Sequence, residues 1–204
     1  MSRVSYSRLA RRLNVFTARL GRNSQGVAAV EFGLIAPVLL LMLVGTIEVS
    51  RAISIDRKFG AVTSAIADLI TRERQVTSAD ITAMYSIVGH MMRPWDSSTL
   101  KIAIVPVKSN IINQNTRCVY AQTTNRPALN GASQTAYGSS YALTNDLMEK
   151  GTAVVVIESS YTFTPLFVFS FMGSSTWTDK AILTPRDGHV QFDTPDRFST
   201  NPPC

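Results

Sequence analysis

A single carboxylate inside a long apolar segment is the first chemically notable feature of this chain. The segment Ser24–Leu43, SQGVAAVEFGLIAPVLLLML, is apolar enough to enter a bilayer, yet it carries Glu31. An ionised carboxylate is among the most costly groups to place in lipid. We therefore expect a specific role for Glu31; the alternative is that it lies among the headgroups, near the start of the apolar run, and is only tolerated there.

The two cysteines are the next candidates for chemistry. Cys118 and Cys204 are the only cysteines of the chain. In an oxidising compartment such a pair forms a structural disulfide more often than a catalytic site. We predict this bridge, with the alternative that Cys204, as the last residue, is too mobile to pair.

No motif in the sequence indicates an enzyme. One acidic cluster near the C-terminus lacks a recognisable ligand spacing, and we interpret it as a turn beside a solvated strand. The sequence contains no GxSxG, no HExxH and no P-loop. We therefore predict no catalytic site, no cofactor and no metal. The members of the acidic cluster are Asp187, His189, Asp193 and Asp196.

The distribution of charge separates a basic leader from the rest of the chain. The formal net charge is +6, with 20 basic and 14 acidic residues. Six of the basic residues are arginines within residues 1–26, a segment that contains no acidic residue, so the remainder is formally neutral. A nucleic-acid-binding protein would need a basic patch on its folded part, and we predict no such partner.

The apolar run that follows the leader predicts one membrane-spanning helix. From Val27 to Ile47 the only charge is Glu31, and at ~1.5 Å per residue a helix of this length spans a hydrocarbon core of about 30 Å. An excess of arginines on the amino side places that side in the cytoplasm. We predict that Pro37 bends this helix, because proline lacks an amide hydrogen and clashes with the carbonyl four residues back.

Helical periodicity continues beyond the membrane span. Apolar residues recur at steps of three and four, which predicts that a helix extends to about Arg74. A second, shorter helix should begin at Thr77 or Ser78, with Asp80 in its first turn. The apolar residues of the first pattern are Ile55, Phe59, Val62, Ile66 and Leu69.

After Pro94 the pattern changes to short segments rich in β-branched and aromatic residues, which predict an antiparallel sheet. The polar segment 123–146 is too poor in apolar residues for a core position, and we expect a surface loop. The aromatic run Pro165–Gly173 fits the core, or a surface that meets the membrane or a partner. The predicted strands are Leu100–Val107, Thr116–Gln122, Ala153–Phe163, Lys180–Thr184 and His189–Phe192.

The predicted fold class is therefore α+β: a long N-terminal helix, half in the membrane and half amphipathic, followed by a small antiparallel-sheet domain. The expected organisation is a leader at 1–26, a spine helix at 27–74 and a domain outside the cytoplasm at 75–204. These boundaries follow the changes in charge and periodicity along the chain.

The leader and apolar segment together resemble a type IV prepilin. The sequence GVAAVEFGLIAPVLLLML followed by EVSR is similar to the TadE-like family of the tight-adherence (Tad, or Flp) pilus apparatus. The similarity is strong over about Arg22–Ser54. Major Flp pilins are very short and carry a Glu-Tyr pair, whereas here Phe32 follows Glu31 and a large domain is added, which favours a minor pseudopilin.

The resemblance implies roles for individual residues. A membrane-embedded aspartyl prepilin peptidase would cut between Gly26 and Val27. The new amine of Val27 could then pair with Glu31 of a neighbouring subunit, so that two buried charges become one ion pair. The implied partners are the peptidase, other pilins or pseudopilins, pilus assembly proteins of the inner membrane, and lipid.

Two functions of different class follow. The first is a structural role as a minor pilin or pseudopilin in assembly of an adhesive pilus, in the bacterial inner membrane with the C-terminal domain in the periplasm. The second is an uncleaved signal-anchored protein whose outer domain binds a ligand or is an enzyme. Removal of a peptide ending at Gly26 distinguishes them.

Overall fold

The computed structural model describes residues 24–110, 116–143, 148–167 and 173–192. The chain divides into two compact units, Met1–Val49 and Ser50–Cys204. The long helix α2 (Ser24–Arg72) contributes residues to both units. Its observed bounds agree with the predicted helix to within a few residues at each end.

Large apolar side chains of α2 are exposed throughout the first unit. A surface helix of a water-soluble protein alternates apolar and polar faces, but here Phe32, Leu34 and Met42 are all more than 60% exposed. Among the described residues, α2 is the one helix that is long and apolar enough to cross a membrane. This part of α2 therefore fits a membrane anchor. The helix continues through Pro37, and a bend there stays a prediction.

The part of α2 in the second unit packs one apolar stripe into the core. Ile55, Phe59, Val62 and Ile66 are buried, as their spacing predicts. Ile70 is fully buried at the end of the stripe, and Leu69, which the pattern had placed there, is only half-buried. Complete burial of side chains of this size contributes about 1.5–3 kcal/mol each.

A capping box starts the second helix, α3 (Ser78–Met92). The hydroxyl of Thr77 accepts a hydrogen bond from the Asp80 amide at 3.2 Å, and the Asp80 carboxylate accepts one from the Thr77 amide at 2.9 Å. The two bonds satisfy amides that have no partner within the helix. The predicted helix start is thereby confirmed.

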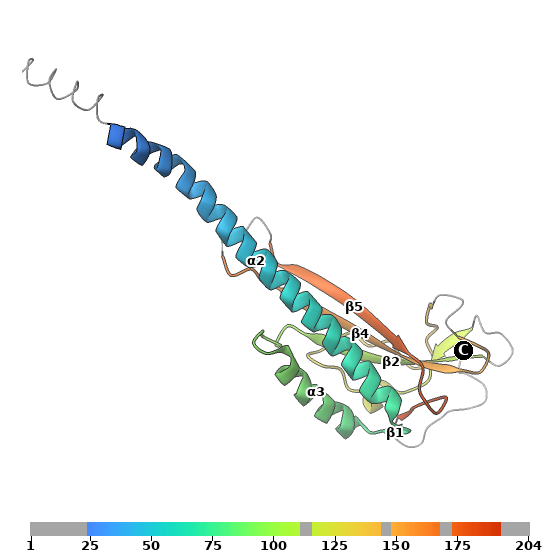
Figure 1. Ribbon diagram of the computed structural model, residues 1–204. Helices are drawn as coiled ribbons and strands as arrows, with labels where there is room; N and C mark the ends of the chain where they lie inside the picture. The colour runs from blue at the N-terminus through green and yellow to red at the C-terminus, as the bar shows by residue number, and fades with distance from the viewer. Residues whose placement is uncertain (1–23, 111–115, 144–147, 168–172, 193–204) are drawn as a thin grey trace, which may run out of the picture. The chain divides into compact units, whose positions relative to one another are not determined.

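Four strands form an antiparallel sheet in the order β3 (Arg117–Val119), β2 (Lys101–Ser109), β4 (Ala153–Phe163), β5 (Ser175–Leu183). Figure 1 shows β2, β4 and β5 side by side, with α3 beside them. β4 has the predicted bounds, and β5 begins five residues earlier than predicted. The predicted α+β class, with a long N-terminal helix and a small antiparallel sheet, is confirmed.

The last predicted strand lies outside this sheet. β6 (Gln191–Phe192) pairs in parallel with β1 (Gln75–Val76), a strand that the sequence pattern did not indicate. The Gln191 amide donates to the Arg74 carbonyl at 2.9 Å, and Phe192 is buried against Tyr120. The expectation that residues 189–192 join the antiparallel sheet was wrong, because burial of Phe192 holds them beside the end of α2.

The two faces of the sheet have different surroundings. Alternate residues of β2 and β4, including Ile104, Ile157 and Phe163, pack against α2 and α3. The opposite face has an apolar half, built around Val105 and Val156, and a polar half. The apolar half is covered by Tyr141, Leu143 and Met148.

Candidate functional site

The predicted processing residues lie at the start of α2. A Cβ atom added to Gly26 would meet no atom within 4 Å, and the next side chain, Val27, is 60% exposed. Glu31 lies one turn further along and is exposed, and its carboxylate forms no hydrogen bond or ion pair with any described residue. The three residues are thus accessible in this chain, and their roles stay predictions.

The predicted disulfide involves one residue inside and one outside the described part. Cys118 is fully buried in β3. Cys204 lies outside the described residues, so the bridge stays a prediction.

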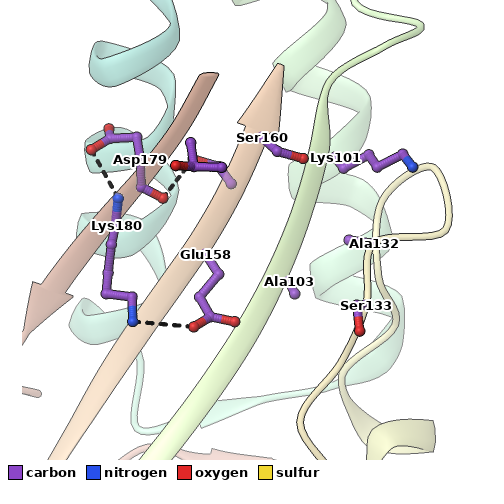
Figure 2. A pocket seen from close by; sticks show the side chains of 10 residues that line it. Lys101, Ala103, Ala132, Ser133, Glu158, Ser160, Asp179 and Lys180 are labelled. Atoms are coloured by element: carbon purple, nitrogen blue, oxygen red, sulfur yellow. Dashed lines mark hydrogen bonds and ion pairs between the residues drawn. The ribbon is translucent and has the colours of Figure 1, made fainter. Parts of the chain in front are cut away.

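An open hollow of about 720 Å³ lies on the polar half of the outer sheet face. Figure 2 shows Lys101 and Ala103 on β2, Glu158 on β4, and Ala132 and Ser133 on the neighbouring loop. The strand register explains this composition, because residues paired across an antiparallel sheet share a face. One row consists of Lys101, Ser160 and Thr178, and the next of Ala103, Glu158 and Lys180.

A cluster of three ionisable groups lies at one side of the hollow. The Lys180 ammonium is 3.3 Å from the Glu158 carboxylate and donates a hydrogen bond to the Tyr141 hydroxyl at 2.7 Å. The Tyr141 hydroxyl in turn donates to Glu158 at 2.5 Å. Burial, followed by the hydrogen bond to Glu158, raises the pKa of Tyr141. The hydrogen bond to Tyr141 raises the pKa of Lys180.

These shifts do not favour Lys180 as a nucleophile or Tyr141 as a general base. A lysine nucleophile or a tyrosinate base needs a lowered pKa so that its deprotonated form is populated near neutral pH. Here both pKa values move the other way, so Lys180 stays an ammonium and Tyr141 a phenol. The cluster offers a fixed pattern of charge and hydrogen-bond donors.

Arg126 is the residue that sequence reasoning missed most clearly. It belongs to the polar segment 123–146, which we expected at the surface, yet it is fully buried. Its guanidinium donates to the carbonyls of Ala121 at 3.2 Å and Ile104 at 2.6 Å, and also to that of Thr135. Burial lowers the pKa of Arg126 to about 10. The expectation that this segment holds no core position was wrong, because one guanidinium with three carbonyl partners can be buried.

One signal in the sequence indicates the turn that shapes this segment. Asn130 and Gly131 both have positive φ, 50° and 68°. An Asn-Gly pair favours such a turn, since both residues tolerate the left-handed region. The Leu129 amide then donates to the Ile102 carbonyl at 2.9 Å, which brings the loop against the edge of β2 beside the hollow.

The acidic cluster near the C-terminus is only partly described. The Asp187 carboxylate forms an ion pair with the Arg74 guanidinium at 2.7 Å, and both side chains lie at the surface. Asp193 and Asp196 lie outside the described residues. Within the described ranges, no group of three or more metal-ligating side chains is present.

The aromatic run Pro165–Gly173 begins with exposed side chains. Leu166 is 62% exposed and Phe167 is 40% exposed, whereas Phe163, at the end of β4, is buried. Residues 168–172 lie outside the described part. For Leu166 and Phe167, the structure favours the surface alternative over the core.

Comparison with protein families gives a match that falls on α2. The family model described as TadE-like protein matches residues 26–68. The resemblance inferred from Gly26, Glu31 and the apolar segment is thereby confirmed over this part of the chain. Comparisons with curated proteins and with solved structures find no match.

Proposed function

We propose that this chain is a minor pilin or pseudopilin that acts in assembly of an adhesive Tad-type pilus. The observation that carries the proposal is the TadE-like match to residues 26–68, which starts at Gly26 and includes Glu31. The exposed apolar side chains of α2 up to Val49 support a membrane anchor. The role is structural and requires no catalytic residue.

The proposed topology follows from charge. The arginines of residues 1–26 keep the amino terminus in the cytoplasm, so α2 crosses the bacterial inner membrane once and the second unit lies in the periplasm. A prepilin peptidase then cuts between Gly26 and Val27. The mature subunit associates with other pilins or pseudopilins through the amine of Val27 and Glu31 of a neighbour.

Mass spectrometry of the membrane-extracted protein, from cells that contain the apparatus, tests this proposal. The expected mature amino terminus is Val27. A protein that keeps the terminus near Met1, in cells with active peptidase, would contradict it.

Two glycine variants sharpen the test. Gly26→Leu should keep the leader attached while membrane insertion continues, because the bulky leucine side chain would no longer fit the active site of the peptidase. Gly33→Leu is the matched control, since a Cβ at either glycine meets no atom within 4 Å. Both variants leave packing within this chain unchanged, so only the first should lose processing.

The second function keeps one observation in its favour. An uncleaved anchor with a ligand-binding outer domain would use the hollow beside Lys101, Glu158 and Lys180. It predicts that the leader remains on the protein in the same experiment.

A further inference from the structure

Arg51 must lie near the membrane surface because of its place in the chain. The apolar run ends at Ile47, four residues before Arg51. Four residues extend about 6 Å in a helix and at most ~14 Å in an extended chain. The headgroup region adds about 5–8 Å to each side of the hydrocarbon core. Chain connection alone therefore keeps Arg51 at or just beyond the headgroups.

The loop after α3 is held beside Arg51. The guanidinium carbon of Arg51 lies 5.4 Å from the centre of the Trp95 ring, a cation–π contact. The Lys58 ammonium donates to the Arg93 carbonyl, and the Tyr161 hydroxyl donates to the Asp96 carbonyl at 3.0 Å. The loop is thus tied to both α2 and β4, and Trp95 lies at the same end of the unit as Arg51.

The direction of β4 brings a second segment to this end. Ser159 contacts Thr63 at 2.7 Å, and two residues later the Tyr161 ring lies 6.1 Å from that of Phe59, four residues earlier on α2. β4 therefore runs antiparallel to α2, toward Arg51. Two residues of a strand and four of a helix advance by nearly the same ~6 Å. When the chain after β4 continues to advance along α2 by four helix residues for every two of its own, it comes to lie beside Arg51.

The side chains exposed at this end combine cationic, amphipathic and apolar groups. Arg93 is exposed, Trp95 is half-buried, and Leu166 and Phe167 are 62% and 40% exposed. The one acidic residue of the loop, Asp96, uses both carboxylate oxygens to accept bonds from Ser98. The Ser98 bonds lower the pKa of Asp96, so it keeps its negative charge beside the positive charges of Arg93, Arg51 and Lys58.

We propose that this end of the second unit, formed by Arg93, Trp95, Leu166 and Phe167, docks on the surface of the bilayer that α2 crosses. The ligand is the headgroup and upper acyl region of an anionic phospholipid leaflet. Tryptophan favours this interface because its ring is apolar and its N–H is polar, and arginines attract anionic headgroups. The inference uses the membrane anchor of the proposed function and is independent of a role in a pilus.

Depth-dependent quenching of Trp95 tests the docking. The full-length Trp177→Phe variant, whose only tryptophan is Trp95, is reconstituted in phosphatidylcholine–phosphatidylglycerol vesicles with brominated acyl chains. Bromines near the headgroups should reduce Trp95 emission more than bromines near the bilayer centre. The Trp95→Phe variant should show a smaller loss, because its remaining Trp177 pairs with Tyr161, which lies beside Phe59 and so about 12 Å along α2 from Arg51.

Charge variants test the role of anionic lipid. Arg93→Gln should weaken the quenching in vesicles that contain phosphatidylglycerol. Arg74→Gln is the matched control, since Arg74 is exposed just beyond the C-terminal end of α2, 23 residues after Arg51, and it should leave the quenching unchanged. Flotation of each variant with vesicles reports insertion of α2 separately, so loss of the anchor and loss of docking give different results.

Two results would overturn the proposal. The first is that, in floated vesicles, aqueous iodide quenches the Trp95 fluorescence fully and brominated lipid leaves it unchanged. The other is a Trp95 shielded from iodide only after other pilus proteins are added, which would indicate a protein partner at this surface.

Discussion

The side-chain oxygens of Thr63 and Ser159 lie 2.7 Å apart in the buried interface between α2 and β4, although the residues are 96 positions apart in the chain. Thr63 is also within bonding distance of the Phe59 carbonyl, at 3.1 Å, and Ser159 of the Asp179 carbonyl, at 3.2 Å. Each hydroxyl can donate only one hydrogen bond at a time. The contacts of Thr63 with Phe59, of Ser159 with Asp179 and of Thr63 with Ser159 therefore share two protons, and only two of these three bonds form at once. The pair links helix to sheet without an unpaired polar group.

Because the three contacts share two protons, we predict a small coupling between Thr63 and Ser159 in the free energy of unfolding. Ser159→Ala leaves Thr63 able to donate to Phe59, and Thr63→Val leaves Ser159 able to donate to Asp179. Each single change should lower the free energy of unfolding by about 0.5–1.5 kcal/mol, the net contribution of one hydrogen bond. Urea unfolding of the two single variants and the double variant, in detergent, measures the coupling; strictly additive losses would show that the direct bond contributes nothing.

Arg126 should be more important for stability than any exposed arginine. Arg126→Met removes the donor of three carbonyls, and each buried carbonyl left without a donor costs about 1–3 kcal/mol. Arg126→Lys should also destabilise the protein, because an ammonium lacks the planar fork of a guanidinium. Arg72→Met is the control: Arg72 pairs with Asp68 at the surface, so the change should stay within ~0.5 kcal/mol. Equal losses from Arg126→Met and Arg72→Met in thermal unfolding would contradict this assignment.

The capping box predicts a dependence of stability on acid pH. The Thr77 amide and hydroxyl bonds lower the pKa of Asp80 below 3.8. A carboxyl whose folded pKa is depressed stabilises the fold above its unfolded pKa and loses this effect as pH falls through the folded value. The melting temperature should therefore fall as the pH drops below the unfolded pKa of an aspartate, about 4, and it should fall less in Asp80→Asn.

Asp56→Asn controls for the change of charge in this experiment. Asp56 lies exposed on α2. The variant should keep the acid dependence of the wild type in circular dichroism melts. If Asp56→Asn loses as much of the acid dependence of the melting temperature as Asp80→Asn does, the dependence comes from overall charge and not from the capping box.

A Cys118–Cys204 bridge should appear in protein exported to the periplasm. It would close a loop of roughly 85 residues and stabilise the fold by about 2–5 kcal/mol in the chain-entropy estimate. Non-reducing peptide mapping should recover the two cysteine peptides joined. Recovery of both thiols in free form would reject the bridge.

Glu31 should affect association and leave insertion intact. Glu31→Ala makes the membrane span more apolar, so insertion should improve by up to ~3 kcal/mol, and cleavage after Gly26 should continue. The amine of Val27 would then lack an acidic neighbour in a packed bundle, where an unpaired charge costs roughly 3–5 kcal/mol. Glu31→Asp keeps the carboxylate and should retain more association. Co-purification with other pilus components measures the loss, and wild-type assembly of Glu31→Ala would mean that the glutamate is only tolerated.

The sequence alone determined the features that depend on near neighbours in the chain. The candidate membrane-spanning helix follows from an apolar run in which Glu31 is the only charge, and the start of α3 follows from Thr77 and Asp80, three residues apart. The bounds of β4 follow from a run of β-branched and aromatic residues. These signals are local, because helix and strand periods and caps involve residues within a few positions of each other.

The tertiary structure alone decided the pairings between distant residues. β6 joins β1 in parallel, and Lys101 meets Ser160 and Thr178 to form the hollow, because packing of the whole unit fixes strand order and register. Burial of Arg126 likewise needs carbonyls from β2 and from both sides of its loop. A polar loop carries no local pattern that distinguishes a solvated arginine from one whose partners are brought together only by the fold.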